Sequence, residues 1–326
     1  MAHVAWSEGS GEHRRHRSAK EEYFRLTTLL CGKLPGESGE DMIIGPGQHV
    51  HPFTFVLPNE QLPMSFETET GRVRYTIKAT VDRPWAIDYV TTQPFTVLSA
   101  LDLNSIPEAK VSDQNQVSKT ICCLCCASGP ITSHFRIDKR GYVPGETIVV
   151  NGDVVNNSSR NILSVAAILE MVTTYKADGA RKTHRKEVAS IRDDGIGPMG
   201  AVTWSGKQLK VPAVPASFLV GCNIIDITYI LKITADAEHT PFDVDVPLTI
   251  IVGTIPLASG QFTEPVSAME FQTPPQPIVV AQPMPGGQLP PPSYAEYAFG
   301  KVDIQDDKNQ YGELSYAPVY QYYDYS

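Results

Sequence analysis

Apolar and polar residues alternate along most of the first 255 positions of the chain. In residues 71–81 every second side chain is apolar, while the residues between them are polar or charged. The apolar set is Val73, Tyr75, Ile77, Ala79 and Val81. Residues 146–155 and 224–233 show the same alternation. Because successive side chains of a strand point to opposite faces, this period of two predicts half-buried β-strands.

Short polar segments rich in Pro, Gly, Asn and Asp separate these strands. They include PNEQLP (58–63), YVPGE (142–146) and KADGAR (176–181), which have the composition of tight turns. We find no long stretch with the apolar spacing of an amphipathic helix. The fold class is therefore predicted to be all-β, built from immunoglobulin-like β-sandwiches.

Two changes in composition divide the chain. The segment LNSIPEAKVSDQNQ (103–116) separates two strand-rich blocks. After PLTIIVGTIPL (247–257) the sequence becomes rich in proline and tyrosine, with 11 of the 26 prolines and 8 of the 14 tyrosines at position 256 or later. Such composition is typical of extended, partly polyproline-II disorder. We expect a partial sandwich over residues 1–105, a linker over 106–117, a second sandwich over 118–255 and a disordered tail over 256–326.

The overall composition narrows the class of protein. The chain has 326 residues, of which 42% are hydrophobic and 19% charged, and its net charge of -9 argues against nucleic acid as a partner. Its longest uninterrupted apolar run, residues 121–127, is far shorter than the roughly 20 residues that cross a bilayer. Met1 is not followed by a charged and then an apolar leader region, so we expect a cytosolic protein.

No motif in the sequence supports catalysis or cofactor binding. The sequence contains no G-x-S-x-G, H-E-x-x-H or G-x-x-x-x-G-K-[ST]. Gly195, Gly197 and Gly200 match G-x-G-x-x-G, but a proline interrupts them and strand-like sequence follows, which indicates a turn. His49 and His51 could share one face of a strand, yet the sequence positions no third metal ligand beside them. We predict that the protein is not an enzyme and uses neither a metal nor another cofactor.

Four of the six cysteines lie in one run, CCLCC: Cys122, Cys123, Cys125 and Cys126. Adjacent cysteines do not close an ordinary disulfide without strain, and an intracellular chain is kept reduced, so we expect thiols. Alternation along a strand would send the side chains to both faces, which favours small apolar packing residues. Acylation of these cysteines and a thiolate metal site are the open alternatives.

The segment LPPPSYAEYAFG in the tail carries the most specific signal. Pro291, Pro292 and Tyr294 have P-P-x-Y spacing within a proline-rich stretch. A polyproline-II helix has three residues per turn, so it presents the prolines and the tyrosine to an aromatic-lined groove, typically that of a WW domain. Pro318 and Tyr320, in the sequence APVY, form a second and weaker candidate, because alanine replaces its first proline.

Long segments of the chain resemble the α-arrestins, the arrestin domain-containing adaptor proteins. Residues 53–85 (FTFVLPNEQLPMSFETETGRVRYTIKATVDRPW) are similar to the first arrestin domain of that family. Residues 121–148 and 197–233 are similar to the second. The resemblance implies two arrestin-type β-sandwiches in series, and the family carries P-P-x-Y motifs after the second sandwich.

The first block departs from the family pattern. The α-arrestin N-terminal sandwich usually begins with several strands before the segment that resembles MAHVAWSEGSGE, whereas here Met1 opens directly onto it. We therefore expect the first sandwich to be incomplete, with unpaired strand edges and exposed apolar faces.

The resemblance implies a trafficking adaptor. In this interpretation the sandwiches engage a membrane receptor or transporter as cargo, and the tail recruits the WW domains of a HECT-type ubiquitin ligase, which promotes ubiquitination, endocytosis and endosomal sorting. The protein would be cytoplasmic, with peripheral recruitment to the plasma membrane and endosomes. One alternative is a ligase-independent arrestin-fold trafficking scaffold. Another is a secreted adhesion sandwich, which would need oxidised cysteines.

Overall fold

The structure, a computed structural model, describes residues 1–33, 37–38, 42–83, 85–123, 126–238, 243–258, 292–304 and 315–325. Within these ranges its regular elements are β-strands and short 3-10 turns, which confirms the predicted all-β fold class. Among the described residues no helix has both the length and the apolar character that a membrane crossing requires.

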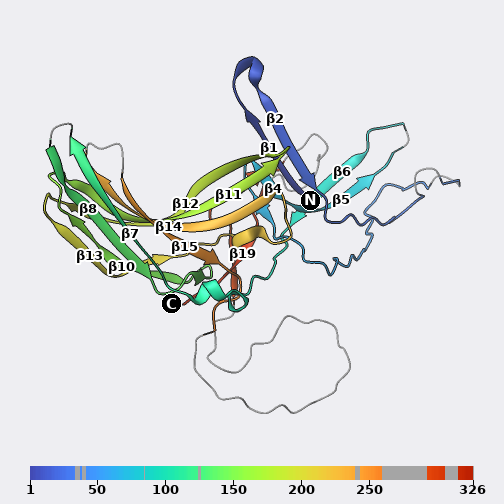
Figure 1. Ribbon diagram of the computed structural model, residues 1–326. Helices are drawn as coiled ribbons and strands as arrows, with labels where there is room; N and C mark the ends of the chain where they lie inside the picture. Colours follow the sequence, from blue (N-terminus) through green and yellow to red (C-terminus); the bar gives the residue numbers. More distant parts are fainter. Residues whose placement is uncertain are drawn as a thin grey trace, which may run out of the picture.

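The second block is a two-sheet β-sandwich, seen as stacked layers of strands in Figure 1. One sheet, in the order β13-β10-β8-β7, consists of β7 (Asp113–Cys123), β8 (Cys126–Ile137), β10 (Thr147–Asn156) and β13 (Ala201–Lys210). The other, in the order β12-β11-β14-β15-β9, consists of β9 (Gly141–Tyr142), β11 (Ile162–Ala177), β12 (Ala180–Ile196), β14 (Ile225–Ala237) and β15 (Val244–Val252). Neighbouring strands are antiparallel except β15 and β9.

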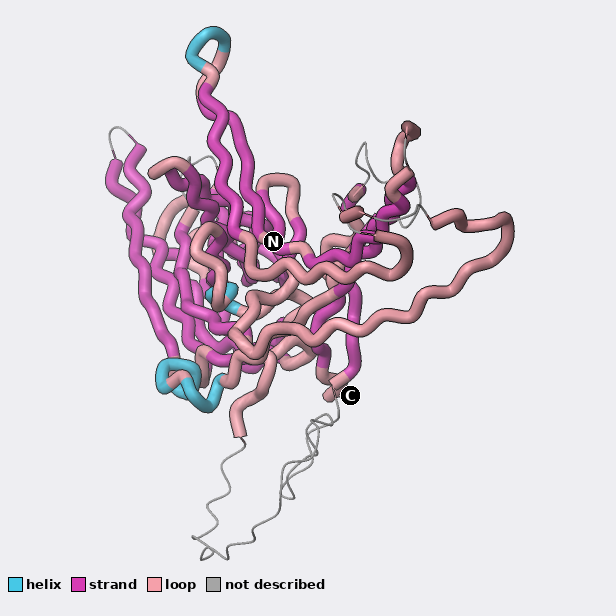
Figure 2. Tube along the Cα trace, turned by 90° about the vertical axis from the view of Figure 1, so that its right-hand side faces the viewer, coloured by secondary structure: helices cyan, strands magenta, loops and turns pink. Residues whose placement is uncertain are grey.

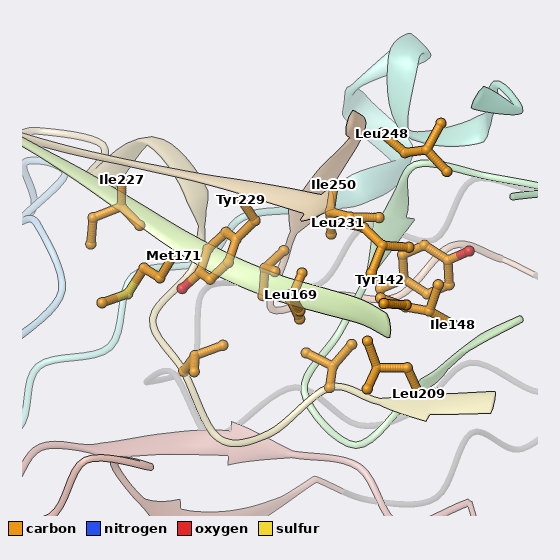
Figure 3. Packing of buried hydrophobic residues seen from close by; sticks show 14 of the residues in the cluster. Tyr142, Ile148, Leu169, Met171, Leu209, Ile227, Tyr229, Leu231, Leu248 and Ile250 are labelled. Atoms are coloured by element: carbon orange, nitrogen blue, oxygen red, sulfur yellow. The ribbon is translucent and has the colours of Figure 1, made fainter. Parts of the chain in front are cut away.

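The core of this sandwich follows from alternation along its central strands. Side chains of β14, which pairs with β11 and β15, are alternately buried and half-buried along the whole strand. Ile227, Tyr229 and Leu231 are almost fully buried and lie in one apolar cluster with Leu169 and Met171 of β11 (Figure 3). The strands predicted from the period of two in this block are therefore confirmed.

The first block combines a four-stranded sheet with a separate hairpin. The sheet, in the order β2-β1-β4-β3, consists of β1 (Ala2–Glu8), β2 (Arg15–Glu21), β3 (Phe66–Glu67) and β4 (Gly71–Val73). A 3-10 turn, η1 (Gly11–His13), lies at the tip of the β1–β2 hairpin, which projects from the body (Figures 1 and 2). The hairpin of β5 (Tyr75–Val81) and β6 (Tyr89–Phe95) forms a two-stranded sheet by itself.

Burial along this part of the chain differs from the single half-buried strand predicted over residues 71–81. The strand is divided into β4 and β5, and only its start is buried: Tyr75 is 3% exposed, but Ile77 and Val81 are 39% and 48% exposed. The reason is that no second sheet covers the β5–β6 hairpin within the described residues. The first sandwich is thus incomplete over these residues, as predicted.

The connection between the blocks is shorter than the predicted linker over 106–117, because β7 already begins at Asp113. Two 3-10 turns, η2 (Leu103–Ser105) and η3 (Pro107–Lys110), precede it. Leu103 and Ala109 are fully buried and pack in a small cluster with Tyr323 near the end of the chain. A fourth turn, η4 (Ser217–Leu219), lies between β13 and β14.

Two longer stretches of the predicted tail fall within the described residues and form short strands. Residues 292–304 and 315–325 contain four short strands: β16 (Ser293–Glu296), β17 (Val302–Asp303), β18 (Ser315–Tyr316) and β19 (Val319–Tyr322). β16 pairs with β19 and β17 with β18, and β19 lies against the body of the molecule (Figure 1). Several tyrosines of these two stretches, among them Tyr297 and Tyr320, are buried against the sandwiches. The rest of the predicted tail beyond residue 258 lies outside the described residues.

Candidate functional site: the tyrosine-rich tail

The first P-P-x-Y motif lies at the start of the described tail. Pro291 falls outside the described residues, and Pro292 is exposed. Tyr294 is in β16, with 61% of its surface exposed, and pairs with Gln321 of β19. The Ser293 hydroxyl donates to the Tyr322 carbonyl oxygen at 3.0 Å. The tyrosine ring is therefore accessible, but its backbone belongs to a β-hairpin and does not follow a polyproline-II helix.

The second candidate motif is placed very differently. Tyr320 is only 2% exposed, and its hydroxyl donates to the Ser65 carbonyl oxygen at 3.0 Å. Its ring meets that of Tyr297 edge-on, with the ring centres 5.5 Å apart. Burial raises the pKa of Tyr320 well above its ordinary value. In this conformation a WW domain has no access to the Tyr320 ring, so the assignment of Pro318 and Tyr320 as a weaker binding site stays a prediction.

Other tail side chains contact the first block. Tyr297 is 3% exposed and its ring lies 6.4 Å, centre to centre, from that of Phe66 in β3. The hydroxyl groups of Tyr316 and Thr96 are hydrogen-bonded at 3.0 Å, and the Val319 amide donates to the same Thr96 hydroxyl at 3.3 Å. Burial raises the pKa of Tyr297 and of Tyr316. These contacts bind the tail to the strands and loops of the first block.

The tail also contacts the second block through backbone hydrogen bonds. The Tyr323 amide donates to the Pro144 carbonyl oxygen at 2.9 Å, and the Tyr323 hydroxyl donates to the Thr254 carbonyl oxygen at 2.8 Å. The Ala298 amide donates to the carbonyl oxygen of Ala213 at 3.0 Å. The described tail therefore bridges the two blocks.

Gly145 makes the closest approach between the tail and the second block possible. A Cβ atom on Gly145 would lie 1.8 Å from the Tyr323 carbonyl oxygen, and the glycine has a φ of +94°, which other residues rarely adopt.

Two lysine side chains lie over aromatic rings of the tail. The Lys186 ammonium lies 3.4 Å from the centre of the Phe299 ring, and the Lys210 ammonium lies 5.4 Å from the centre of the Tyr322 ring.

Sequence reasoning missed this docking, although one signal was present. In the sequence SYAPVY (315–320) the large residues Tyr316, Pro318 and Tyr320 occupy every second position, and these are the positions that are buried. That is the period of two typical of a strand with one covered face. The high proline content of the preceding segment dominates the composition of the tail and masks this short alternation.

The cysteine run lies at the connection between β7 and β8. Cys122 and Cys123 are in β7, and Cys126 in β8 pairs with Cys123, while Cys125 is outside the described residues. No group of three potential metal ligands gathers within the part of the chain that the structure describes. Acylation or metal binding at these cysteines stays untested.

The glycine-rich motif and the histidine pair that the sequence also offered lie at a turn and on an exposed stretch, respectively. Gly197 and Gly200 lie in the turn between β12 and β13, as predicted from their sequence context, whereas Gly195 lies in β12. The rings of His49 and His51 stack with their centres 6.5 Å apart on an exposed, strand-free stretch, and they do not share a strand.

Comparison with known proteins identifies both blocks. Residues 2–104 match the family model for the arrestin (or S-antigen) N-terminal domain, and residues 127–257 match the model for the arrestin (or S-antigen) C-terminal domain. Together these ranges account for most of the chain before the tail. The tail beyond residue 257 lies outside both matches.

Several characterised proteins are similar over much of their length. The chain is 31% identical to arrestin domain-containing protein 17 of Caenorhabditis elegans, covering 99% of this chain and 88% of that protein. It is 33% identical to mouse arrestin domain-containing protein 4, over 86% of this chain and 65% of that protein, and 31% identical to human thioredoxin-interacting protein over 77% and 63%. This similarity supports a general role as a trafficking adaptor. The chain belongs to the α-arrestin family of arrestin domain-containing proteins.

Proposed function

We propose that this protein is an adaptor that links a WW-domain HECT-type ubiquitin ligase to membrane protein cargo. Pro291, Pro292 and Tyr294 contact the ligase, while the arrestin sandwiches engage a receptor or transporter. The consequences are ubiquitination of the cargo, its endocytosis and its endosomal sorting. The protein acts as a binding partner and not as an enzyme, and it works in the cytoplasm, with peripheral recruitment to the plasma membrane and endosomes.

One observation carries the ligase part of the proposal. Tyr294 is the tyrosine of a P-P-x-Y sequence, and its ring is 61% exposed beside the exposed Pro292. Most other described tail tyrosines are buried or half-buried. A WW-domain groove accepts a proline and a tyrosine ring from the same peptide, so accessibility of both rings is the first requirement for binding.

Calorimetric titration of the full chain with a tandem WW-domain fragment tests this proposal. We expect micromolar-range binding that Tyr294→Ala weakens at least tenfold, which corresponds to about 1.4 kcal/mol of lost binding free energy. The matched control is Tyr325→Ala, which removes a second exposed tail tyrosine outside any P-P-x-Y sequence. Equal affinity of the wild-type protein and the Tyr294→Ala variant would exclude this motif as the ligase contact.

A ligase-independent trafficking scaffold is the second candidate. The observation that favours it is the pairing of Tyr294 with Gln321, because it gives the motif a structural place in the β16–β19 hairpin. In that case Tyr294→Ala would leave cargo sorting in cells unchanged. Loss of cargo ubiquitination and of endosomal delivery in the same variant would instead support the ligase adaptor.

A further inference from the structure

Two positions of the P-P-x-Y motif, Ser293 and Tyr294, are already engaged in a strand. Ser293, Tyr294, Ala295 and Glu296 pair in register with Tyr322, Gln321, Tyr320 and Val319. A WW domain binds its peptide as a polyproline-II helix, with three residues per turn, whereas the side chains of a strand repeat every two residues. The same residues cannot satisfy both geometries, so β16 must leave β19 before the groove can take the motif.

We propose that the docked tail is an autoinhibitory latch that withholds the P-P-x-Y motif from WW domains until it detaches from the two sandwiches. This inference rests on the proposed function and specifies its regulation. The latch is formed by the paired strands β16 and β19, and the seam between the first and second blocks is its receptor.

Burial of tyrosine rings holds the latch closed. Tyr297 and Tyr320 are 3% and 2% exposed and lie in the same apolar cluster as the cores of both blocks. Tyr297 follows Tyr294 by only three residues, and Tyr320 is opposite Ala295 in the hairpin. Each anchor is therefore directly beside the motif, so drawing the motif into a groove strains or breaks the contacts of both.

Backbone hydrogen bonds make detachment cooperative. The Tyr320 hydroxyl donates to the Ser65 carbonyl oxygen in the first block, and the amides of Tyr323 and Ala298 donate to carbonyl oxygens of the second block. An isolated two-stranded hairpin is marginally stable in water at best, so β16 and β19 depend on these contacts. Loss of the anchors should release the whole hairpin and not one residue of it.

The latch and the second-motif interpretation make opposite predictions for Tyr320→Ala. If Tyr320 binds a WW domain, its removal weakens binding. If Tyr320 closes the latch, its removal frees the first motif and strengthens binding, because the apparent dissociation constant equals the intrinsic one divided by the fraction of competent protein. The sign of the change separates the two roles.

The experiment compares the full-length wild-type protein, the variants Tyr320→Ala and Tyr325→Ala, and a peptide of residues 281–326, each titrated with the same tandem WW-domain fragment. The peptide has no sandwiches to dock on and reports the unlatched affinity. We expect the wild-type protein to bind at least about tenfold more weakly than the peptide. Tyr320→Ala should recover most of this difference, and Tyr325→Ala should match the wild-type protein.

A second variant tests the latch independently, in case Tyr320→Ala disturbs folding. Ala298→Pro removes the amide that donates to Ala213 while leaving every residue of both sandwiches unchanged. It should also increase the affinity for the WW-domain fragment. Hydrogen exchange along β14 should be the same in the wild-type protein and in both tail variants, which shows that the second sandwich is intact.

Hydrogen exchange also measures detachment of the latch directly. Saturation with the WW-domain fragment should accelerate exchange at the amides of Ala298, Val319 and Tyr323, each of which is hydrogen-bonded to a sandwich. Unchanged protection at these amides, or equal affinities of the wild-type protein, Tyr320→Ala and the peptide, would overturn the latch alone. Absence of binding by the peptide would overturn the proposed ligase contact and the latch with it.

Discussion

The two blocks of this protein share a fold class but differ in how completely they bury their strands. In the second block two sheets cover each other, and Trp204 of β13 is 1% exposed, edge-on to Phe135 with ring centres 5.5 Å apart. In the first block Trp85, in the turn of the β5–β6 hairpin, is completely exposed and has a φ of +63°. The first block thus contains a fully solvated tryptophan, Trp85, as well as a buried one, Trp6 of β1, which is 5% exposed.

The difference in burial between the two blocks shows which contacts stabilise the first block. Several of its buried residues lie where it meets the second block and the tail. A Cβ atom on Gly71 of β4 would lie 2.8 Å from the Tyr175 ring of β11, which shows how closely the two blocks approach there. Phe66 packs against Tyr297 of the tail. The β5–β6 hairpin, which lacks such neighbours, is exposed along most of its length.

Replacement of Trp204 and of Trp85 should give the largest contrast. Trp204→Ala leaves a cavity in the second sandwich and should reduce the free energy of unfolding by about 3–5 kcal/mol. Trp85→Ala removes no buried surface and should change it by less than about 0.5 kcal/mol. Denaturant unfolding of both variants measures the difference. Similar losses at the two positions would show that the Trp85 ring is covered in solution.

A buried ion pair in the first block provides a smaller but clear effect. Arg74 donates to both carboxylate oxygens of Glu67 at 2.6 and 2.8 Å, and the Glu67 side chain is 2% exposed. Burial raises the pKa of Glu67, although Arg74 opposes this. Arg74→Met should cost about 3 kcal/mol, because it leaves a buried carboxylate without its partner. Glu67→Gln, which neutralises the acid and keeps an acceptor, should cost less.

The cost of Arg74→Met should depend on pH in a defined direction. A buried carboxyl with a raised pKa binds more protons in the folded than in the unfolded state, so stability falls as the pH rises. The penalty should be absent below the unfolded pKa of about 4.3 and fully developed above the raised folded pKa. Unfolding at pH 4 and pH 7 measures it. A penalty independent of pH would show that Arg74 acts through packing alone.

The sequence predicted the second block better than the first, for a physical reason. Alternation over 224–233 arises from a strand that is covered on one face by its own block, so it predicted β14 directly. The same alternation over 71–81 predicted a strand but not its exposure, because exposure depends on which other strands are present. Tyr316 and Tyr320 share the period of two of a half-covered strand, but that period does not say which surface covers them. P-P-x-Y spacing could identify a motif, but it contained no information on the β16–β19 pairing.

The smallest predicted effect concerns the contact between the tip of β11–β12 and the first block. Asp178 and Gly179 form the turn, both with positive φ, and the Asp178 carboxylate accepts the Ser18 amide of β2 at 3.2 Å. Asp178→Gly keeps a residue that tolerates this backbone but removes the acceptor, so it should cost about 0.5–1.5 kcal/mol. Asp178→Asn keeps both the turn preference and an acceptor oxygen and should cost less. Thermal unfolding measures these losses, and hydrogen exchange at Ser18 localises them. If the Ser18 amide exchanges at the same rate in the wild-type protein and in Asp178→Gly, the Asp178 carboxylate does not protect this amide. The two blocks are then joined through their other contacts, such as the hydrogen bond from the Ala216 amide to the Met64 sulfur.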